Sequence, residues 1–273
     1  MPSLSFDSEN GKAIAYIKVS KEELKAKPEL KTYNNQIIYL HDNNDGVKEI
    51  EFDDLSIFPL FKFKEGEKQI NRINIQGKSG SGKTTLVGKM LDTMLSKRHG
   101  NPDKEIVIIS GIDSDDPLDK PRGPKGNKKL PERIDIYDPE FGDMTEKDFE
   151  NCIVCFDDCE NLTNKAVSRV VLNLRNALLE KGRHSNADVI SISHNPLSGS
   201  ITRFVHSEAT AFVVFPAFAQ VHQLNTYLKK YAGLSKQTIE KIINLGETKS
   251  RWIYVNNLAP CYVIYQKGIF LVR

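Results

Sequence analysis

The chain has 273 residues, of which 39% are hydrophobic and 27% charged, so it can bury a sizeable core and is not a disordered polymer. Its formal net charge of +2 excludes polyanion binding through an overall basic field, which leaves a local basic patch as the route to nucleic acid. The first residues lack a basic and apolar signal pattern, and the longest run of low polarity, 209–219, is shorter than the roughly 20 residues of a bilayer span. We therefore expect a protein that is neither secreted nor inserted in a membrane.

The segment 1–68 is expected to form a small β-rich N-terminal module. It contains one short predicted helix, at 21–27, and a turn-rich stretch at 42–46. No pattern of chemically active residues is visible in it, so packing and subunit contact is its preferred role. The β-like runs of this module are 12–19, 36–41, 47–52 and 57–63.

The phosphate-binding pattern G-x-x-x-x-G-K-[ST], or P-loop, is complete at residues 77–84. A short strand is predicted before it at 73–76, and residues 85–95 follow it with helical periodicity, which is the context that the motif needs. Its glycines let backbone N–H groups converge on a triphosphate at a helix N-terminus. The predicted nucleotide-binding residues are Gly77, Lys78, Ser79, Gly80, Ser81, Gly82, Lys83, Thr84 and Thr85.

The P-loop domain is expected to span 69–273 and to end in helices and a β-hairpin. Ser235 is a candidate N-cap for one of these helices, and Gly246 is its predicted stop. After the P-loop helix, strands are predicted at 105–110, 133–137, 152–158, 188–193, 210–215, 252–256 and 262–272, and helices at 164–183, 220–231 and 236–244.

The position of the acidic strand decides which branch of the P-loop proteins is predicted. Asp157 and Asp158 close the apolar run 152–156 in the manner of a Walker B motif, and a later apolar strand ends in the polar His194 and Asn195. An intervening strand with a polar tip is typical of additional-strand ATPases. The sequence therefore predicts an α/β P-loop NTPase of the additional-strand (RecA/FtsK-like) type with a mainly parallel sheet.

Cys152, Cys155 and Cys159 have a spacing that superficially resembles a metal site. However, Cys152 and Cys155 lie on one predicted strand, where positions three apart face opposite sides, and no nearby His or Cys completes a tetrahedral set. We interpret them as buried strand thiols rather than zinc ligands.

Taken in order, four stretches resemble the FtsK–HerA-type ATPases: the P-loop, the acidic strand, residues 181–184 and residues 201–203. The chain most resembles the poxvirus-like DNA-packaging ATPases of large double-stranded DNA viruses, virophages and related mobile elements, over about residues 69–231. This resemblance implies ATP and Mg²⁺ as cofactors, double-stranded DNA and a capsid or procapsid vertex as partners, and a ring of about five or six subunits. It also implies location in the host cytoplasm or viral factory, or association with the virion.

The chemistry of phosphoryl transfer assigns roles to the residues of this pattern. Lys83 reaches the β- and γ-phosphates, and the Thr84 hydroxyl with Asp157 binds Mg²⁺. Asp158 polarises the attacking water, where the family commonly has Glu. Glu160 is the alternative base, because alternation would place it on the same face as Asp158 if the strand continues.

Three further features are candidates for sensing or force transmission. His194 or Asn195 would sense the γ-phosphate, where the family often has Gln. Arg183 and Arg203 are candidates for an arginine finger supplied to a neighbouring subunit, although each is also readily explained as a surface arginine. The loop 111–131 and its flank could contact a DNA backbone or be merely solvated; its basic residues are Lys120, Arg122, Lys125, Lys128, Lys129 and Arg133.

The leading hypothesis is thus an enzyme, an ATP-driven translocase that packages double-stranded DNA into a preformed capsid. A nucleoside or nucleotide kinase is the first alternative, since kinases also join a P-loop to a compact α/β domain. The acidic pair on a later strand and the N-terminal module count against it. A nucleotide-dependent assembly scaffold is the second alternative, although a pure scaffold has no need of a complete Mg²⁺–triphosphate site.

Overall fold

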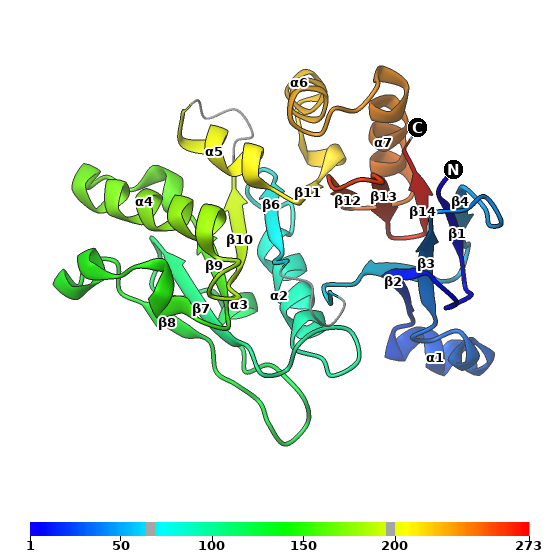
Figure 1. Ribbon diagram of the computed structural model, residues 1–273, viewed down its shortest axis with the longest axis horizontal. Helices are drawn as coiled ribbons and strands as arrows, with labels where there is room; N and C mark the ends of the chain where they lie inside the picture. Colours follow the sequence, from blue (N-terminus) through cyan, green and yellow to red (C-terminus); the bar gives the residue numbers. More distant parts are fainter. Residues whose placement is uncertain (64–68, 195–199, 273) are drawn as a thin grey trace. The chain divides into compact units, whose positions relative to one another are not determined.

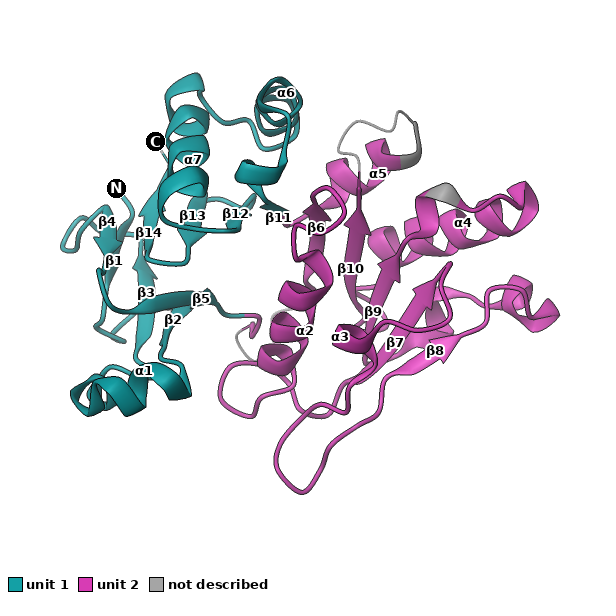
Figure 2. Ribbon diagram, turned by 180° about the vertical axis from the view of Figure 1, so that it is seen from behind, with its two compact units in different colours: residues 1–60, 213–273 teal, residues 61–212 magenta. Residues whose placement is uncertain are grey.

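The computed structural model describes residues 1–63, 69–194 and 200–272 of the chain. Figure 1 shows its helices and strands, with the labels used below. By their contacts, the residues form two compact units, coloured magenta and teal in Figure 2. Among the described residues, no helix is long and apolar enough to cross a membrane.

The unit formed by residues 61–212 contains parallel strands in the order β6–β10–β9–β7–β8. β9 and β10 are buried at every position, which is typical of parallel strands that are covered on both faces. The strands are β6 (Arg72–Gln76), β7 (Glu105–Ser110), β8 (Glu132–Ile134), β9 (Cys152–Asp157) and β10 (Asp188–Ser193).

β10 separates the P-loop strand β6 from the acidic strand β9. Ile192 of β10 pairs with Ile75 of β6 on one side and with Asp157 of β9 on the other. The predicted strand order of the additional-strand class is therefore confirmed, and with it the mainly parallel α/β fold of this unit.

The connections between these strands explain which helices share a face of the sheet. The connections from β6 to β7 and from β7 to β8 run in one direction and carry α2 (Lys83–Met94) and α3 (Asp116–Asp119). The connection from β9 to β10 runs in the opposite direction and carries α4 (Lys165–Lys181). Because such crossovers are right-handed, α4 lies on the face opposite to α2 and α3 (Figure 1).

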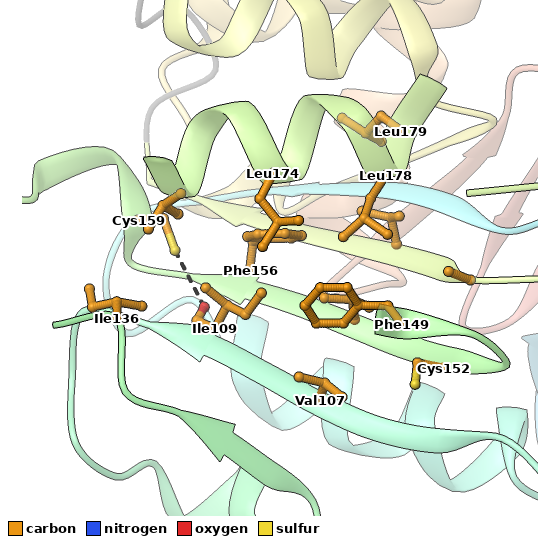
Figure 3. Packing of buried hydrophobic residues seen from close by; sticks show 14 of the residues in the cluster. Val107, Ile109, Ile136, Phe149, Cys152, Phe156, Cys159, Leu174, Leu178 and Leu179 are labelled. Carbon is orange, nitrogen blue, oxygen red and sulfur yellow. Dashed lines mark hydrogen bonds between the residues drawn. The ribbon is translucent and has the colours of Figure 1, made fainter. Parts of the chain in front are cut away.

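The core under α4 follows from the alternation of side chains along β7 and β9. Val107, Ile109, Val154 and Phe156 point to one face, and Figure 3 shows Leu174 and Leu178 of α4 packed above them. Val205 of α5 (Ser200–Glu208) joins this cluster, so α5 covers the same face as α4. Full burial of each such aliphatic or aromatic side chain contributes about 1.5–3 kcal/mol.

The second unit, residues 1–60 with 213–273, contains a four-stranded antiparallel sheet and a second group of antiparallel strands. One has the order β1–β3–β2–β5, and the other pairs β4 with β14, β14 with β13, and β13 with β12. Its elements are β1 (Ser3–Ser5), β2 (Lys12–Lys18), α1 (Lys21–Ala26), a 3-10 helix (Pro28–Thr32), β3 (Ile37–His41), β4 (Glu49–Glu51), β5 (Ser56–Pro59), a 3-10 helix (Pro216–Phe218), α6 (Val221–Tyr231), α7 (Lys236–Thr248), β12 (Ile253–Asn256), β13 (Tyr262–Tyr265) and β14 (Gly268–Leu271).

This grouping differs from the predicted boundary after residue 68. The β-rich N-terminal segment is present, but it joins the C-terminal residues rather than standing alone. The reason is a strand pairing that is distant in sequence: Ile50 of β4 pairs with Ile269 of β14. β11 (Ala211–Val214) crosses the limit between the two units.

Gly246 does not end a helix as predicted, because α7 continues through it to Thr248. A Cβ atom at Gly246 would lie 2.4 Å from the ring of Pro216. The glycine therefore serves close packing between α7 and Pro216 and not a helix stop. The predicted N-cap is confirmed, since the Ser235 hydroxyl accepts a hydrogen bond from the backbone N–H of Thr238.

A buried ion pair fastens the amino ends of β6 and β10. Lys104 Nζ lies 2.8 Å from Asp188 Oδ2, and both side chains are less than a tenth exposed. Asp188 Oδ1 accepts hydrogen bonds from the backbone N–H of Asn71 at 2.6 Å and from its side-chain amide at 3.0 Å. Each buried charge is thus paired and hydrogen-bonded, which is the condition for tolerating it.

Removing one partner of this pair should be costly. We expect Lys104→Met to lower the free energy of unfolding by about 3 kcal/mol, because the Asp188 carboxylate would stay buried without its cation. Urea denaturation measures this loss. The double variant Lys104→Met/Asp188→Asn should recover most of it, and Lys27→Met, which breaks an exposed pair with Asp54, should change the urea midpoint far less than Lys104→Met. An equal loss in the single and double variants would contradict the pairing.

Candidate active site

The P-loop joins the end of β6 to the start of α2. Gly80 and Gly82 have φ angles of 75° and 97°, in the left-handed region that favours glycine. Gly82 is the N-cap of α2, so the helix begins at Lys83 with its N-terminus at the loop. The Gly77 N–H donates to the carbonyl of Ser193 at 3.2 Å, which ties the loop to the end of β10.

Lys83 is held by its own loop and is 6% exposed. Its Nζ donates to the carbonyls of Gly77 at 2.7 Å and Lys78 at 3.2 Å, and lies 3.3 Å from Nδ1 of His194. Burial lowers the pKa of Lys83, whereas the charges of the nearby acids raise it. These acids are Asp157, Asp158 and Glu160. Phosphate oxygens are acceptors of the kind that Lys83 already contacts, so the ammonium is suitably placed to bind them.

Asp157 is the last residue of β9 and is 3% exposed. Burial, followed by the charges of Asp158 and Asp115, raises the pKa of Asp157 to about 7. A divalent cation would offset this crowding of negative charge, and Thr84, the second residue of α2, supplies a hydroxyl at the same edge of the sheet. The residues present therefore fit a Mg²⁺ ion held by Asp157 and Thr84.

Asp158 leaves the strand direction immediately after Asp157. Its backbone is left-handed, with φ 52° and ψ 28°, and a 3-10 helix (Cys159–Asn161) follows. The strand therefore does not continue to Glu160, and strand alternation, on which the shared face of Asp158 and Glu160 was predicted, does not apply. Glu160 instead accepts a hydrogen bond from the Ser193 hydroxyl, while the Asp158 carboxylate contacts His194.

His194 bridges the lysine and the second aspartate. Its Nε2 lies 2.6 Å from Asp158 Oδ1, and its Nδ1 faces Lys83 Nζ. An ammonium group can only donate, so Nδ1 is assigned as the acceptor and Nε2 as the protonated nitrogen that donates to Asp158. The predicted sensor residue thus lies between the groups that would bind the phosphates and orient the water. Asn195 lies outside the described residues.

Asp115 is a neighbour of the site that the sequence analysis did not single out. It follows β7, whose last residue, Ser110, pairs with Asp157. Burial raises the pKa of Asp115, and its charge contributes to the raised pKa of Asp157. The sequence could have indicated Asp115, because it follows a predicted parallel strand, and the carboxyl ends of such strands meet at one edge of the sheet.

The two candidate arginines lie in different places. Arg183 is exposed just after α4, and its charge adds to burial in lowering the pKa of Arg72, the first residue of β6. It therefore lies at the amino edge of the sheet, away from the P-loop of its own chain. Arg203 is exposed on α5, which begins after the carboxyl end of β10.

The basic loop 111–131 has more structure than predicted. It contains α3 and a short antiparallel bridge between Arg122 and Lys129. Arg122 is buried and donates to Asp92 at 2.9 Å, and Lys129 donates to Glu105 at 2.7 Å. Arg133 pairs likewise with Asp119. Three basic side chains remain exposed: Lys120, Lys125 and Lys128.

Cys152 and Cys155 are buried on β9 as predicted, whereas Cys159 is buried in the 3-10 helix that follows the strand. Cys152, Cys155 and Cys159 are buried and free. Burial raises the pKa of Cys155 and of Cys159 to about 12, so both are protonated thiols at neutral pH. Cys159 donates its S–H to the carbonyl of Ile109 at 3.3 Å, as Figure 3 shows.

The complete P-loop, the acidic end of β9 and the position of β10 between β6 and β9 define a P-loop NTPase of the additional-strand type. The charged groups of this site, Lys83, Asp157 and Asp158, gather at the carboxyl edge of the sheet, where ligands of such folds bind.

No protein-family model matches the chain. The chain is 29% identical over 199 residues to "Uncharacterized protein V3" of the Sputnik virophage, which covers 72% of this chain and 75% of that protein. Among solved structures it is similar to the genome packaging NTPase B204 from Sulfolobus turreted icosahedral virus 2 in complex with AMPPCP. That match has 14% identity and a TM-score of 0.42 and covers 76% of this chain and 97% of B204.

The chain is also similar to the pCW3 conjugation coupling protein TcpA with ATPγS. Here the identity is 13% and the TM-score 0.47, and the match covers 99% of this chain and 87% of that chain. These likenesses are too distant to assign a function, which rests on the site of this chain.

Substitutions should separate nucleotide binding from hydrolysis. We expect Lys83→Ala to abolish turnover and weaken ATP binding, because Lys83 would contact the phosphates already in the ground state. Asp158→Asn should keep ATP binding within about twofold and lower turnover by about 100-fold or more, because it removes the group that would accept the proton of the attacking water. Binding of a fluorescent ATP analogue and release of phosphate measure the two effects.

Glu160→Gln is the comparison for Asp158→Asn, since each replaces a carboxylate with an amide of the same shape. Normal turnover in Asp158→Asn together with lost turnover in Glu160→Gln would move the base to Glu160. The pattern expected from the structure is the reverse.

Proposed function

We propose that this chain is an ATP-driven double-stranded DNA translocase of the FtsK–HerA packaging type that moves a viral genome into a preformed capsid. The observation that carries the ATPase part is the assembly of Lys83, Asp157, Asp158 and His194 at one edge of the sheet. The resemblance of residues 69–231 to packaging ATPases supports the DNA substrate. The same resemblance, with the similarity to a virophage protein, supports a host cytoplasm or viral factory as its location.

In the proposed reaction, each residue has a separate task. Lys83 exchanges the carbonyls of Gly77 and Lys78 for β- and γ-phosphate oxygens. Thr84 and Asp157 would hold Mg²⁺, which would supply positive charge against the charge that develops on the phosphates. Asp158 orients a water and accepts its proton while the water oxygen attacks the γ-phosphorus and the bond to ADP breaks.

His194 is proposed to report whether a γ-phosphate is present. It contacts Lys83 and Asp158 at the same time, so a phosphate that draws Lys83 away changes the partners of Asp158. The His194 imidazole thus connects Lys83, which would bind the phosphates, to Asp158, which would orient the water. This connection between the two residues needs no movement of the sheet.

Ring assembly would complete the site with an arginine from a neighbouring subunit. Arg203 is the better candidate in this proposal, because it is exposed on the helix that follows the carboxyl end of β10. Arg183 is exposed at the amino edge of the sheet, near Arg72, and is the second candidate. About five or six subunits and a capsid or procapsid vertex as docking partner belong to the same proposal.

The strand order counts against the kinase alternative. In the kinase and GTPase branch the acidic strand lies beside the P-loop strand, whereas here β10 lies between β6 and β9. A pure scaffold is disfavoured by the buried Lys83 and Asp157, whose charges are costly unless they serve a ligand.

The exposed lysines of the basic loop are the proposed contacts to the DNA backbone. The triple variant Lys120→Ala/Lys125→Ala/Lys128→Ala should lose most DNA-stimulated ATP turnover and keep basal turnover, because its contacts with phosphates are electrostatic and lie outside the nucleotide site. If all three lysines contact phosphates, the slope of log affinity against log salt should flatten by about three units. Turnover with and without linear duplex DNA and binding titrations at several salt concentrations measure both effects.

Lys229, Lys230 and Lys236 provide a matched control, since their replacement by Ala removes the same charge from the other unit. Arg122 and Lys129 are left intact because they hold the loop together. A triple loop variant that responds to duplex DNA like the parent would contradict the assignment. Loss of stimulation in the control instead would move the DNA contact to the C-terminal helices, and transfer of phosphate to a nucleoside would establish the kinase.

A further inference from the structure

A charged network lies behind the nucleotide site, on the side of α4. Arg175 of α4 is 1% exposed and is one of the largest fully buried side chains of the described residues. Glu160, in the 3-10 helix after β9, is largely buried and accepts a hydrogen bond from the hydroxyl of Ser193, the last residue of β10. His194, which contacts Lys83 and Asp158, is the next residue along the chain.

The charges in this network support one another. Burial raises the pKa of Glu160, while the Ser193 hydrogen bond and then the charge of Arg175 lower it. Burial lowers the pKa of Arg175, and the charge of Glu160 opposes this most strongly. A buried carboxylate and guanidinium are expensive to desolvate, and apolar side chains would fill the same space at less cost. Their presence is therefore better explained by a task than by packing.

We propose that Glu160 and Arg175 are positioning residues for ATP hydrolysis. Glu160 holds the end of β10 through the Ser193 hydroxyl, so that His194 stays between Lys83 and Asp158. The buried Arg175 acts on Glu160 through its positive charge. This inference rests on the proposed ATPase function and gives Glu160 a role different from that of a base.

The geometry supports this role at two points. The Glu160 carboxylate uses Oε1 for the Ser193 hydroxyl, so one of its two oxygens is already committed to β10. The left-handed backbone at Asp158 turns the chain so that Asp158 meets His194 while Glu160 meets Ser193. Ser193, the last residue of β10, is thus held by Glu160, and the next residue, His194, is held by Asp158.

The network also connects the site to α4. Arg175 belongs to the buried side of this helix, which includes Leu174 and Leu178 in the core. A displacement of α4 would move the positive charge beside Glu160 and, through Ser193, the ring of His194. Events on the exposed side of α4 could therefore change hydrolysis without any contact to the nucleotide.

Ser193→Ala is the most direct test, and Ser191→Ala is its matched control. Ser191 is also buried and lies two residues earlier on the same strand, away from the hydrogen bond to Glu160. Ser193→Ala should lower kcat by about tenfold or more, as misplacement of a catalytic contact does, and leave KM for ATP within about twofold. Ser191→Ala should match the parent in both constants.

The second readout is the imidazole of His194, observed by ¹⁵N NMR in histidine-labelled protein. Its signals are assigned by their loss in His194→Asn, because the chain has six histidines. In the parent, we expect the Nε2-protonated form that the contacts to Lys83 and Asp158 indicate. Ser193→Ala should shift or broaden these signals, and Ser191→Ala should leave them in place. This readout needs no turnover, so it tests the positioning role even where ATP hydrolysis itself, and thus the proposed function, fails.

Substitutions of Glu160 distinguish positioning from base catalysis. Glu160→Gln keeps an oxygen that accepts from Ser193, so its kcat should stay within about fivefold of the parent, whereas Glu160→Ala should fall as far as Ser193→Ala. Arg175→Lys, which keeps the positive charge, should retain more turnover than Arg175→Met. Arg169→Ala, which changes an exposed residue of the same helix, serves as the control. Circular dichroism and thermal melting identify any variant that loses its fold.

Two results would overturn the inference. One is Ser193→Ala with the kcat and the His194 signals of the parent. The other is Glu160→Gln that is as inactive as Glu160→Ala while the His194 signals are unchanged, which would make Glu160 the base.

Discussion

The pairing of β10 with both β6 and β9 is the constraint from which the site follows. Parallel strands end at the same edge of a sheet, so the P-loop after β6, the polar tip after β10 and the acids at the end of β9 are brought together by backbone hydrogen bonds alone. The position of β10 between β6 and β9 also sets the distance between the P-loop and the acids of β9. Because β10 lies between the phosphate-binding loop and the acids, its tip residue His194 can touch both.

This convergence concentrates charge where water is scarce. Asp157 is buried beside a second carboxylate, and Lys83 is buried beside three acids, so every ionised group there depends on its neighbours. Removal of any one of these charged groups would therefore leave its neighbours without part of their compensating charge. A triphosphate with a divalent cation brings both signs of charge to this edge, and this explains why such a site can couple nucleotide occupancy to the contacts of Asp158.

The sequence was sufficient to predict the P-loop, the order of the central strands and the acidic end of β9. The P-loop and the acidic strand were predicted from local signals, namely a complete glycine-rich motif and short apolar runs that are typical of buried strands. The strand order was predicted instead from the arrangement that is typical of additional-strand ATPases. The N-cap at Ser235 is local in the same sense, since one hydroxyl satisfies a backbone group three residues later.

Other features depend on contacts that are distant in sequence or on backbone detail. The pairing of β4 with β14 joins an N-terminal segment to a C-terminal one, and no sequence pattern within either segment indicates this pairing. The left-handed backbone of Asp158 redirects Glu160 away from the strand direction, which alternation could not foresee. Arg175 lies on an amphipathic helix, where a charged residue is ordinarily expected to face water. Likewise, the sequence predicts Arg122 and Lys129 as candidate DNA contacts, whereas in the structure each forms an ion pair within the protein.

The contacts that the sequence did not predict share a physical property. Glu160 was predicted only as an alternative base, and Arg175 and Ser193 belong to no motif. Buried polar interactions nevertheless connect Arg175 of α4 through Glu160 to Ser193, the residue before His194. In the proposed translocase, hydrolysis has to respond to DNA and to neighbouring subunits. In our inference, α4 provides a route for this response, because Glu160 and the Ser193 hydroxyl connect the surroundings of Arg175 to the strand end that carries His194. The Gly77 N–H also donates to the Ser193 carbonyl, so a shift of this strand end would reach the P-loop as well as His194.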